Sequence, residues 1–174
     1  MDTTGYCFAP GSKVLLADGS RQNIEYLQRG DLVWTPHGPI PIMAIVECRR
    51  VSFVYTLSTV NGVTVSPWYP YRHKGTKEWV RPVDTSEYSE YYMPAVYGII
   101  LEAYHSIDVE GLEFVTLGHG FQEPVAYHKY LGTPSVIQAI QNQPGWHTGR
   151  PIYQNHKVTH DRVTGEIDRW YDVY

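Results

Sequence analysis

Tight-turn signals divide most of this chain into short runs of β-forming residues. The pair NG at 61–62 lies inside FVYTLSTVNGVTVSP, between two runs rich in β-branched residues, and is the strongest short-range hairpin signal in the sequence. The pair EG at 110–111 separates HSIDV from LEFVTL, the pair DG at 18–19 closes KVLL, and the pair TG at 164–165 marks a final hairpin. This spacing predicts a chain built mainly from antiparallel hairpins.

Composition agrees with a mostly-β fold. Fifteen tyrosines and twelve prolines favour short strands and turns over long helices. Further strands are expected from about Ile42, after prolines that restrict pairing, and in EWVRPV at 78–83. One short helix with an apolar stripe is expected in PSVIQAIQNQ at 134–143. At 174 residues, the chain fits one β unit with a C-terminal appendage.

Charge, hydropathy and cysteine content exclude several partners. A net charge of −4 argues against nucleic acid, which requires a basic face. No apolar run approaches the roughly 18 residues that span a membrane, and the N-terminus lacks the pattern of a secretory signal. No pair of histidines has zinc-finger spacing to Cys7 or Cys48, so we expect neither a metal nor a cofactor. Two cysteines require no oxidising compartment; the localisation stays open, with the cytoplasm favoured, and we expect a monomer.

The order of these segments resembles the Hint family, which includes the Hedgehog autoprocessing domain and inteins. The resemblance rests on CFAPGSKV with GDLV downstream, on VNGVTVSPWYPYR followed by EWVRPV, and on YGIILEAYHSIDVEGLEFVTLGHG. The motif VTLGHGF and the tail YLGTPSVIQAIQNQPGW resemble, more narrowly, the Vint subgroup attached to von Willebrand factor type A domains. The resemblance covers residues 7–174. It implies an all-β horseshoe with residues 7–117 as the core, residues 118–174 as an extension packed on it, and residues 1–6 as the remnant of an upstream segment.

The same resemblance implies that Cys7 is an autocatalytic nucleophile. Its sulfur would attack the carbonyl of Tyr6 and convert the Tyr6–Cys7 peptide bond into a thioester, an N–S acyl shift. This step is uphill for an ordinary amide, so it requires a partly deprotonated thiol, donors for the developing oxyanion and a proton for the departing nitrogen. The partner of the reaction would be the covalently attached upstream segment.

A Thr-x-x-His segment usually assists this step in the family, and SPWYP occupies that place here. Ser66 at the threonine position keeps the hydroxyl. Tyr69 at the histidine position is a larger departure, because a phenol with a pKa near 10 donates a hydrogen bond but is a poor proton shuttle at neutral pH. Tyr69 could polarise the scissile amide, but we expect a slowed or blocked acyl shift unless another group substitutes. His73 is the nearest candidate.

The second imidazole that the resemblance implies is His105, which assists the later half-reaction. Where an intein would carry its His-Asn pair, this chain has Val115 and Thr116, so no side-chain amide is present to cyclise and intein-type splicing is not expected. The acceptor of the thioester would instead be water, a thiol or an amine.

Three further residues are auxiliary candidates. His119 lies between glycines in LGHGF and is either a turn residue or faces the site. Cys48 is in phase with the apolar residues of its strand, which favours a buried small hydrophobe. In Hedgehog domains an aspartate near this strand end activates the acceptor, and Glu47 or Cys48 lies close to the matching place; a slip of one residue would exchange them.

Two other functions remain alternatives. The first is a Hint fold that has lost its chemistry and acts as a structural or interaction module, for which Tyr69 is the main support. The second is a conventional cysteine hydrolase that acts on other molecules through Cys7 and a histidine. It fits poorly, because nucleophiles of that kind usually lie at a helix N-terminus or a supported elbow, and CFAPGS precedes a strand.

Overall fold

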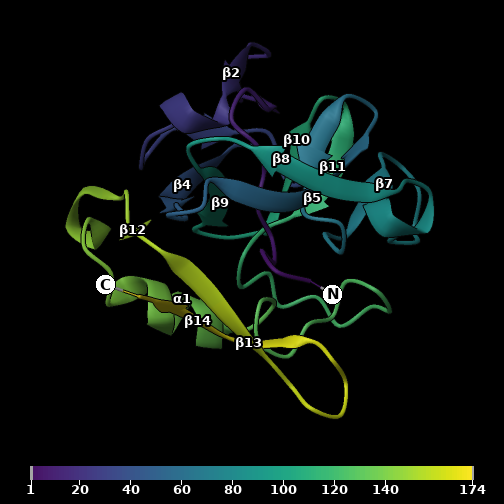
Figure 1. The fold of residues 1–174 in the computed structure, drawn as a ribbon. Coiled ribbons are helices and arrows are strands. Elements are labelled where there is room, and N and C mark those ends of the chain that lie inside the picture. Colours follow the sequence, from purple (N-terminus) through teal and green to yellow (C-terminus); the bar gives the residue numbers. More distant parts are fainter. Residues whose placement is uncertain (1, 174) are drawn as a thin grey trace.

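The computed structural model describes residues 2–173, which fold almost entirely into short strands (Figure 1). The strands are β1 (Lys13–Leu15), β2 (Arg21–Asn23), β3 (Leu32–Val33), β4 (Ile40–Cys48), β5 (Val54–Val60), β6 (Val63–Val65), β7 (Tyr71–His73), β8 (Tyr88–Tyr92), β9 (Val96–Leu101), β10 (Ser106–Val109), β11 (Leu112–Val115), β12 (Ile152–Tyr153), β13 (His156–His160) and β14 (Ile167–Asp172). The helical elements are α1 (Pro134–Gln141) and 3₁₀ turns at Ile24–Tyr26, Pro82–Asp84 and Trp146–Thr148. The all-β class with one short helix is confirmed.

One sheet has five strands in the order β2-β1-β10-β11-β7. Strands β10 and β11 form the hairpin predicted at 110–111, and every residue of both strands is buried. Glu113 is one of the two buried acids of this hairpin, the other being Asp108. Glu113 pairs with Arg72 at 2.9 Å and accepts a hydrogen bond from the Ser106 hydroxyl at 2.7 Å, so its charge is compensated inside the sheet.

Outside the five-stranded sheet, β4 is the strand with which three others pair. It pairs antiparallel with β3 at its beginning, antiparallel with β9 along most of its length, and parallel with the short β12. Each residue of β9 is buried, which places this strand at the centre of the core. Strand β5 pairs with β6 and β8, and Figure 1 shows the β5–β8 ribbon curving across one face of the molecule.

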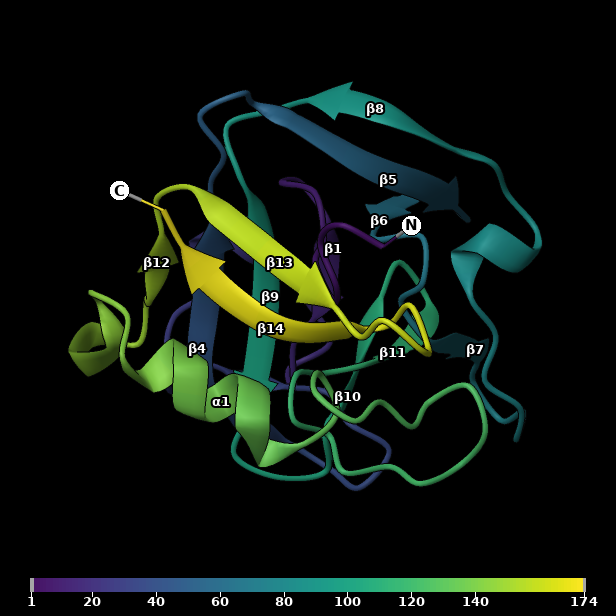
Figure 2. The same cartoon turned by 60° about the horizontal axis from the view of Figure 1, so that its bottom comes forward.

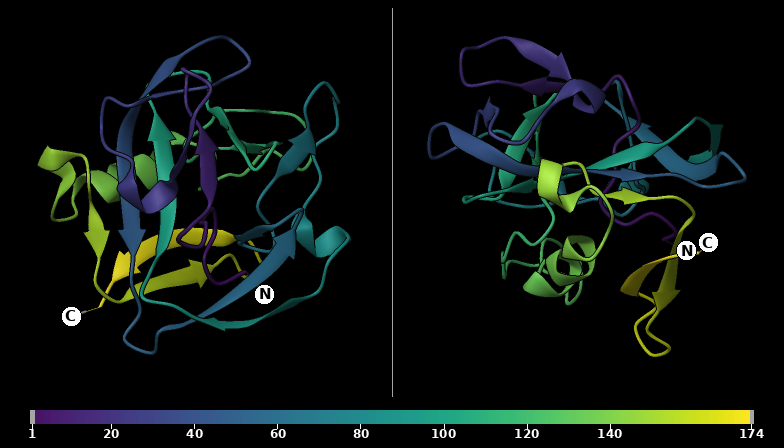
Figure 3. Two further views of the ribbon diagram at one scale, coloured as in Figure 1. Left: turned by 90° about the horizontal axis from the view of Figure 1, so that it is seen from above. Right: turned by 90° about the vertical axis from the view of Figure 1, so that its left-hand side faces the viewer.

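Residues 118–173, here called the C-terminal segment, gather on one side of this core. Figures 1 and 2 show α1 and the β13–β14 hairpin together on that side, and Figure 3 shows the N-terminal end close to the hairpin. An aromatic cluster fixes the hairpin: His156 packs edge-on against Trp170 at 4.6 Å and against Tyr153 at 5.1 Å. Helix α1 begins after Thr133, whose hydroxyl caps it by accepting from Ser135 N. No helix within the described residues has both the length and the apolar character needed to cross a membrane.

One predicted strand is absent, and one observed strand was not predicted. EWVRPV at 78–83 is not a strand: Val80 forms a single bridge with Tyr71, and a 3₁₀ turn follows because Pro82 has no N–H to continue a ladder. The tyrosine-rich segment 88–92, which we did not expect to be extended, is β8. In addition, β4 begins two residues before the predicted Ile42.

Candidate functional site

Cys7 begins an extended segment that runs between β6 and β9. The amide of Phe8 donates to the Tyr97 carbonyl, and the amide of Tyr97 donates back, each at 2.8 Å. On the other side, the Cys7 carbonyl accepts from the Ser66 amide at 2.9 Å. Cys7 and Tyr6 are both buried, so the peptide bond between them lies inside the fold rather than on a surface loop.

The hydroxyl of Ser66 contacts this peptide bond directly. The Cys7 amide donates to Ser66 Oγ at 3.1 Å, and Ser66 Oγ donates to the Cys7 carbonyl at 3.2 Å. The Thr4 hydroxyl lies 2.6 Å from Ser66 Oγ. A hydroxyl has one hydrogen and two lone pairs, so with its own hydrogen on the Cys7 carbonyl, Ser66 must accept from Thr4. The Ser66 hydroxyl therefore uses all its hydrogen-bonding capacity, and its oxygen accepts from the nitrogen of the candidate scissile bond.

Tyr69 lies next to the junction but uses its hydroxyl elsewhere. Its buried ring stacks on Tyr6 with centroids 4.8 Å apart and meets Phe114 edge-on at 5.3 Å. Its hydroxyl donates to the Val115 carbonyl, and burial raises its pKa well above the usual value. The expectation that this phenol polarises the scissile amide is therefore not met, because its only hydrogen is engaged. Ser66 makes the contact with the amide instead.

The alternation of β4 separates Glu47 from Cys48. Cys48 is buried, as predicted; burial first and the neighbouring Cys7 thiol second raise its pKa well above normal. The Glu47 carboxylate instead pairs with two arginines. It accepts from Arg49 Nε at 2.6 Å and lies 3.7 Å from Arg150 Nη2. Of the two candidates on this strand, Cys48 is the one that reaches Cys7.

His119 is buried and its ring faces the junction. It stacks on the Tyr6 ring at 5.9 Å, and its Nδ1 accepts from the Phe121 amide at 2.9 Å. Burial, followed by the nearby His105, lowers its pKa to about 3, so the ring is neutral at pH 7. Its Nε2 has no hydrogen-bond partner within residues 2–173. A Cβ at Gly132 would lie 2.8 Å from that nitrogen, so the glycine makes room for the ring.

The structure places the other two histidine candidates differently. His105 precedes β10, is half-buried, and has a buried Nδ1 without a partner in the described chain. Burial lowers its pKa, and its carbonyl accepts from the Thr116 amide at 2.9 Å. His73 is exposed at the end of β7. Between residues 2 and 173, no hydrogen bond joins either imidazole to Cys7.

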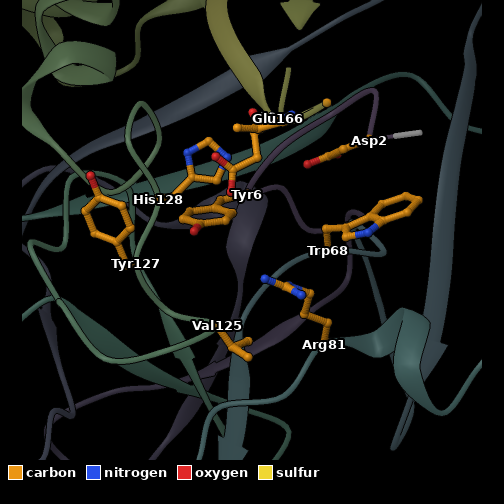
Figure 4. A pocket seen from close by; sticks show the side chains of 10 residues that line it. Asp2, Tyr6, Trp68, Arg81, Val125, Tyr127, His128 and Glu166 are labelled. Atoms are coloured by element: carbon orange, nitrogen blue, oxygen red, sulfur yellow. Dashed lines mark hydrogen bonds between the residues drawn. The ribbon is translucent and has the colours of Figure 1, made fainter. Parts of the chain in front are cut away.

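A cavity of about 340 Å³ lies beside Tyr6 (Figure 4). Its lining includes Trp68, Arg81, His128 and Glu166, and Figure 4 shows the Arg81 guanidinium directed toward the Tyr6 ring. The His128 ring meets Tyr6 edge-on at 5.8 Å, and burial together with the Arg81 charge lowers its pKa to about 4. A neutral imidazole and a cation thus border the space next to the junction, a feature that the sequence did not reveal.

Gly98 is a further site residue that the sequence analysis missed. A Cβ built on it would lie 3.2 Å from the Tyr6 carbonyl oxygen and 2.8 Å from Leu117 Cδ1. The absence of a side chain lets β9 approach the carbonyl that a nucleophile would attack. An isolated glycine inside the strand pattern VYGIIL is a known signal of close backbone approach and could have indicated it.

The fold is all-β and encloses Cys7 together with the peptide bond before it. The family model of Vint, described as a Hint-domain, matches residues 6–169, so the chain belongs to this family. The match spans both the β core and most of the C-terminal segment. No curated protein matches the chain. Among solved structures, the chain is similar to the solution structure of a bacterial intein-like domain from Clostridium thermocellum, with 17% identity, a TM-score of 0.48, and coverage of 63% of this chain and 97% of that one.

Proposed function

We propose that this domain cuts its own chain at the Tyr6–Cys7 bond, with residues 1–6 as the end of the departing segment. In the first step, the Cys7 sulfur forms a bond with the Tyr6 carbonyl carbon, the carbon–nitrogen bond breaks, and the thiol proton ends on the Cys7 nitrogen. The observation that carries the proposal is the Ser66 hydroxyl on that nitrogen at 3.1 Å, inside a closed core. Ser66 is the hydroxyl in contact with that nitrogen, and to deliver a proton to it Ser66 must turn its hydrogen away from the Cys7 carbonyl.

In the second step, an acceptor attacks the thioester carbon. A new bond to water, a thiol or an amine forms, the carbon–sulfur bond breaks, and the acceptor's proton returns to the Cys7 sulfur. We assign the transfer of that proton to His105 or His119, because each ring has a buried nitrogen without a hydrogen-bond partner within residues 2–173. The cavity beside Tyr6 supplies the route for the acceptor. Intein-type splicing is not part of the proposal, because Val115 and Thr116 carry no side-chain amide.

A second candidate is a Hint fold without chemistry, and the engaged hydroxyl of Tyr69 favours it. Hydrolysis of other proteins is disfavoured, because Cys7 has no exposed surface and an external substrate cannot reach its sulfur without opening the core. The two remaining candidates differ in one measurable property, which is whether the chain breaks before Cys7.

The test uses a precursor in which a carrier protein is fused before residue 1. We expect incubation with dithiothreitol or hydroxylamine to release a carrier fragment ending at Tyr6, identified by mass spectrometry. Cys7→Ala should leave the precursor intact, and Ser66→Ala should slow release about 100-fold, because the amide nitrogen loses its proton relay. If neither the unaltered precursor nor its Tyr69→His variant is cleaved at this bond, the proposal is wrong and the silent fold is favoured.

Substitution of Gly98 tests the position of the Tyr6 carbonyl. We expect Gly98→Ala to cost about 1–3 kcal/mol of unfolding free energy, because the added methyl overpacks Leu117 and pushes against the carbonyl oxygen. Cleavage of the precursor should slow as well. Gly38→Ala is the control: its φ of 102° strains an alanine, but no atom lies within 4 Å, so only stability should fall. Urea unfolding and cleavage rates separate the two effects, and equal cleavage rates would show that the carbonyl position does not matter.

A further inference from the structure

The residues before the cut are held as specifically as a bound peptide. We propose that the domain recognises the sequence Thr-Gly-Tyr directly upstream of Cys7, and that Thr4 of the departing segment positions the Ser66 hydroxyl for the first step. The inference rests on the proposed function, since it assigns a sequence requirement to the same cut. The ligand is a peptide segment in the same chain, and its site is formed by β6, the loop before α1 and the β13–β14 hairpin.

Thr4 contributes through its side chain and its backbone. It is fully buried, and its hydroxyl donates to Ser66 Oγ at 2.6 Å, filling the lone pair that the Cys7 amide leaves open. Its carbonyl accepts the Cys7 thiol at 3.5 Å. Thr4 therefore orients both groups that act at the bond, although it belongs to the segment that leaves. Release of the segment removes the donor to Ser66 and so disfavours the reverse reaction.

Gly5 is required by both conformation and space. Its φ is +83°, in the left-handed region that favours glycine. A Cβ at this position would lie 3.1 Å from Leu131 Cδ1 and 3.1 Å from Trp170 Cζ2, two buried side chains of the C-terminal segment. Any other residue would have to displace a packed aromatic ring as well as adopt a strained backbone. The C-terminal segment thus selects glycine at this position.

Tyr6 fills an aromatic slot. Its side chain is only 1% exposed, stacks between Tyr69 and His119, and donates from its hydroxyl to the Ala126 carbonyl at 3.5 Å. A smaller residue would leave a void in the wall next to the scissile carbonyl, and a charged one would be buried without a partner. This position therefore selects a large aromatic side chain.

The domain contacts the two residues before this tripeptide through their backbone carbonyls, and the Asp2 carboxylate accepts from the Gly5 amide at 3.0 Å and from the Thr4 amide at 3.3 Å within the segment itself. Arg50 donates to the Thr3 carbonyl, and the His160 ring contacts the Asp2 carbonyl. Backbone carbonyls are present in every residue, so these contacts tolerate any sequence. The Thr3 hydroxyl is buried and has no partner within residues 2–173. Side-chain recognition by the domain accordingly begins at Thr4, whereas Asp2 shapes the segment from within. Thr3 offers a matched control for Thr4.

The test compares the same substitution at two neighbouring positions in the fused precursor. We expect Thr4→Val to slow thiol-induced cleavage at least 10-fold and Thr3→Val to change it less than twofold, since both replace a hydroxyl by a methyl of similar size. Thr4→Ser, which restores the hydroxyl, should recover most of the rate. Gly5→Ala should slow cleavage more than Thr4→Val does. If the unaltered chain is too slow to measure, all variants are compared in the Tyr69→His background.

A second readout does not depend on cleavage. In the full chain with Cys7→Ala, limited proteolysis should spare residues 2–6, and Gly5→Ala should expose them to cutting while Thr3→Val does not. Cleavage that is equally fast with Thr4→Val and Thr3→Val overturns the positioning role and leaves the proposed function standing. Absence of cleavage in both backgrounds overturns the proposed function, and recognition is then decided by the protection of residues 2–6 alone.

Discussion

A precursor carrying Tyr69→His should cleave between Tyr6 and Cys7 about 10²–10⁴-fold faster than the unaltered precursor, the range that a positioned proton donor contributes. Burial raises the pKa of the Tyr69 hydroxyl well above its usual value, so the phenol keeps its proton throughout the reaction. An imidazole gains and loses a proton near neutral pH and can deliver one to the Cys7 nitrogen. Release of the carrier fragment, followed by mass spectrometry over time, measures the rate.

The same substitution should weaken the fold. The Tyr69 ring packs against Tyr6, Phe8 and Phe114 at centroid distances of 4.8–5.3 Å, and its hydroxyl satisfies the buried Val115 carbonyl. A smaller imidazole leaves a void and an unpaired carbonyl, so we expect a loss of about 2–4 kcal/mol in urea unfolding. Higher activity from a less stable chain would indicate that the tyrosine stabilises the precursor at the expense of turnover.

Tyr69→Phe is the control that separates these effects. It keeps the aromatic packing and removes only the hydroxyl, so it should cost about 1–2 kcal/mol and leave cleavage as slow as in the unaltered precursor. If the phenylalanine and histidine variants cleave equally fast, looser packing is the cause and proton delivery is not. If the phenylalanine variant is much slower than the unaltered precursor, the phenol takes part in the reaction.

Hairpins were predictable because their turns depend on local conformation alone. Asn61 and Gly62 have φ values of 47° and 81°, and Glu110 and Gly111 have values of 53° and 89°, with positive φ at both central residues, as type I′ turns require. Asn and Gly adopt such angles readily, and a glycine following a polar residue is visible in the sequence. The strands beside these turns therefore followed from the pattern.

Pairing between distant segments was less predictable. The tyrosines of β8, at 88, 91 and 92, do not follow the two-residue alternation of a half-buried strand, and this strand is extended because β5 offers it a hydrogen-bonding edge. The contact of Cys7 with Ser66 followed from the family resemblance, since no local pattern joins residues 59 positions apart. The contacts of Thr4 with Ser66 and of Gly98 with the Tyr6 carbonyl were not predicted at all. They arise from the approach of Ser66 and of β9 to the junction, which composition and periodicity do not encode.

Acidification should destabilise this domain, and His156 should carry a measurable part of the effect. Its side chain is buried between Trp170 and Tyr153, and its Nε2 has no partner among the described residues. Burial, followed by the charges of Arg50 and Lys157, lowers its pKa from 6.5 to about 3. Between these values the unfolded chain binds a proton that the folded chain does not, so stability is complete above pH 6.5 and falls as the pH decreases toward 3.

For His156 alone, the loss between pH 7 and pH 4.5 should be about 2.5 kcal/mol. His119 and His128, with pKa values lowered to about 3 and about 4, act in the same direction. Asp2 opposes them: burial raises its pKa to about 6, so its contribution to stability is present at low pH and lost as the pH rises through 6. Three depressed histidines outweigh one elevated carboxyl, and the net result is acid lability.

The comparison of His156→Phe with His147→Phe isolates the contribution of His156 to the loss of stability in acid. The phenylalanine at 156 keeps an aromatic ring in the cluster and cannot take up a proton, so the slope of unfolding free energy against pH should decrease between pH 6.5 and 4.5. His147 is exposed, and its substitution should leave the slope unchanged. An unchanged slope in His156→Phe would assign the acid sensitivity to the histidines around Tyr6. A reduced slope would place it in the β13–β14 hairpin, whose Trp170 and His160 lie against Gly5 and Asp2.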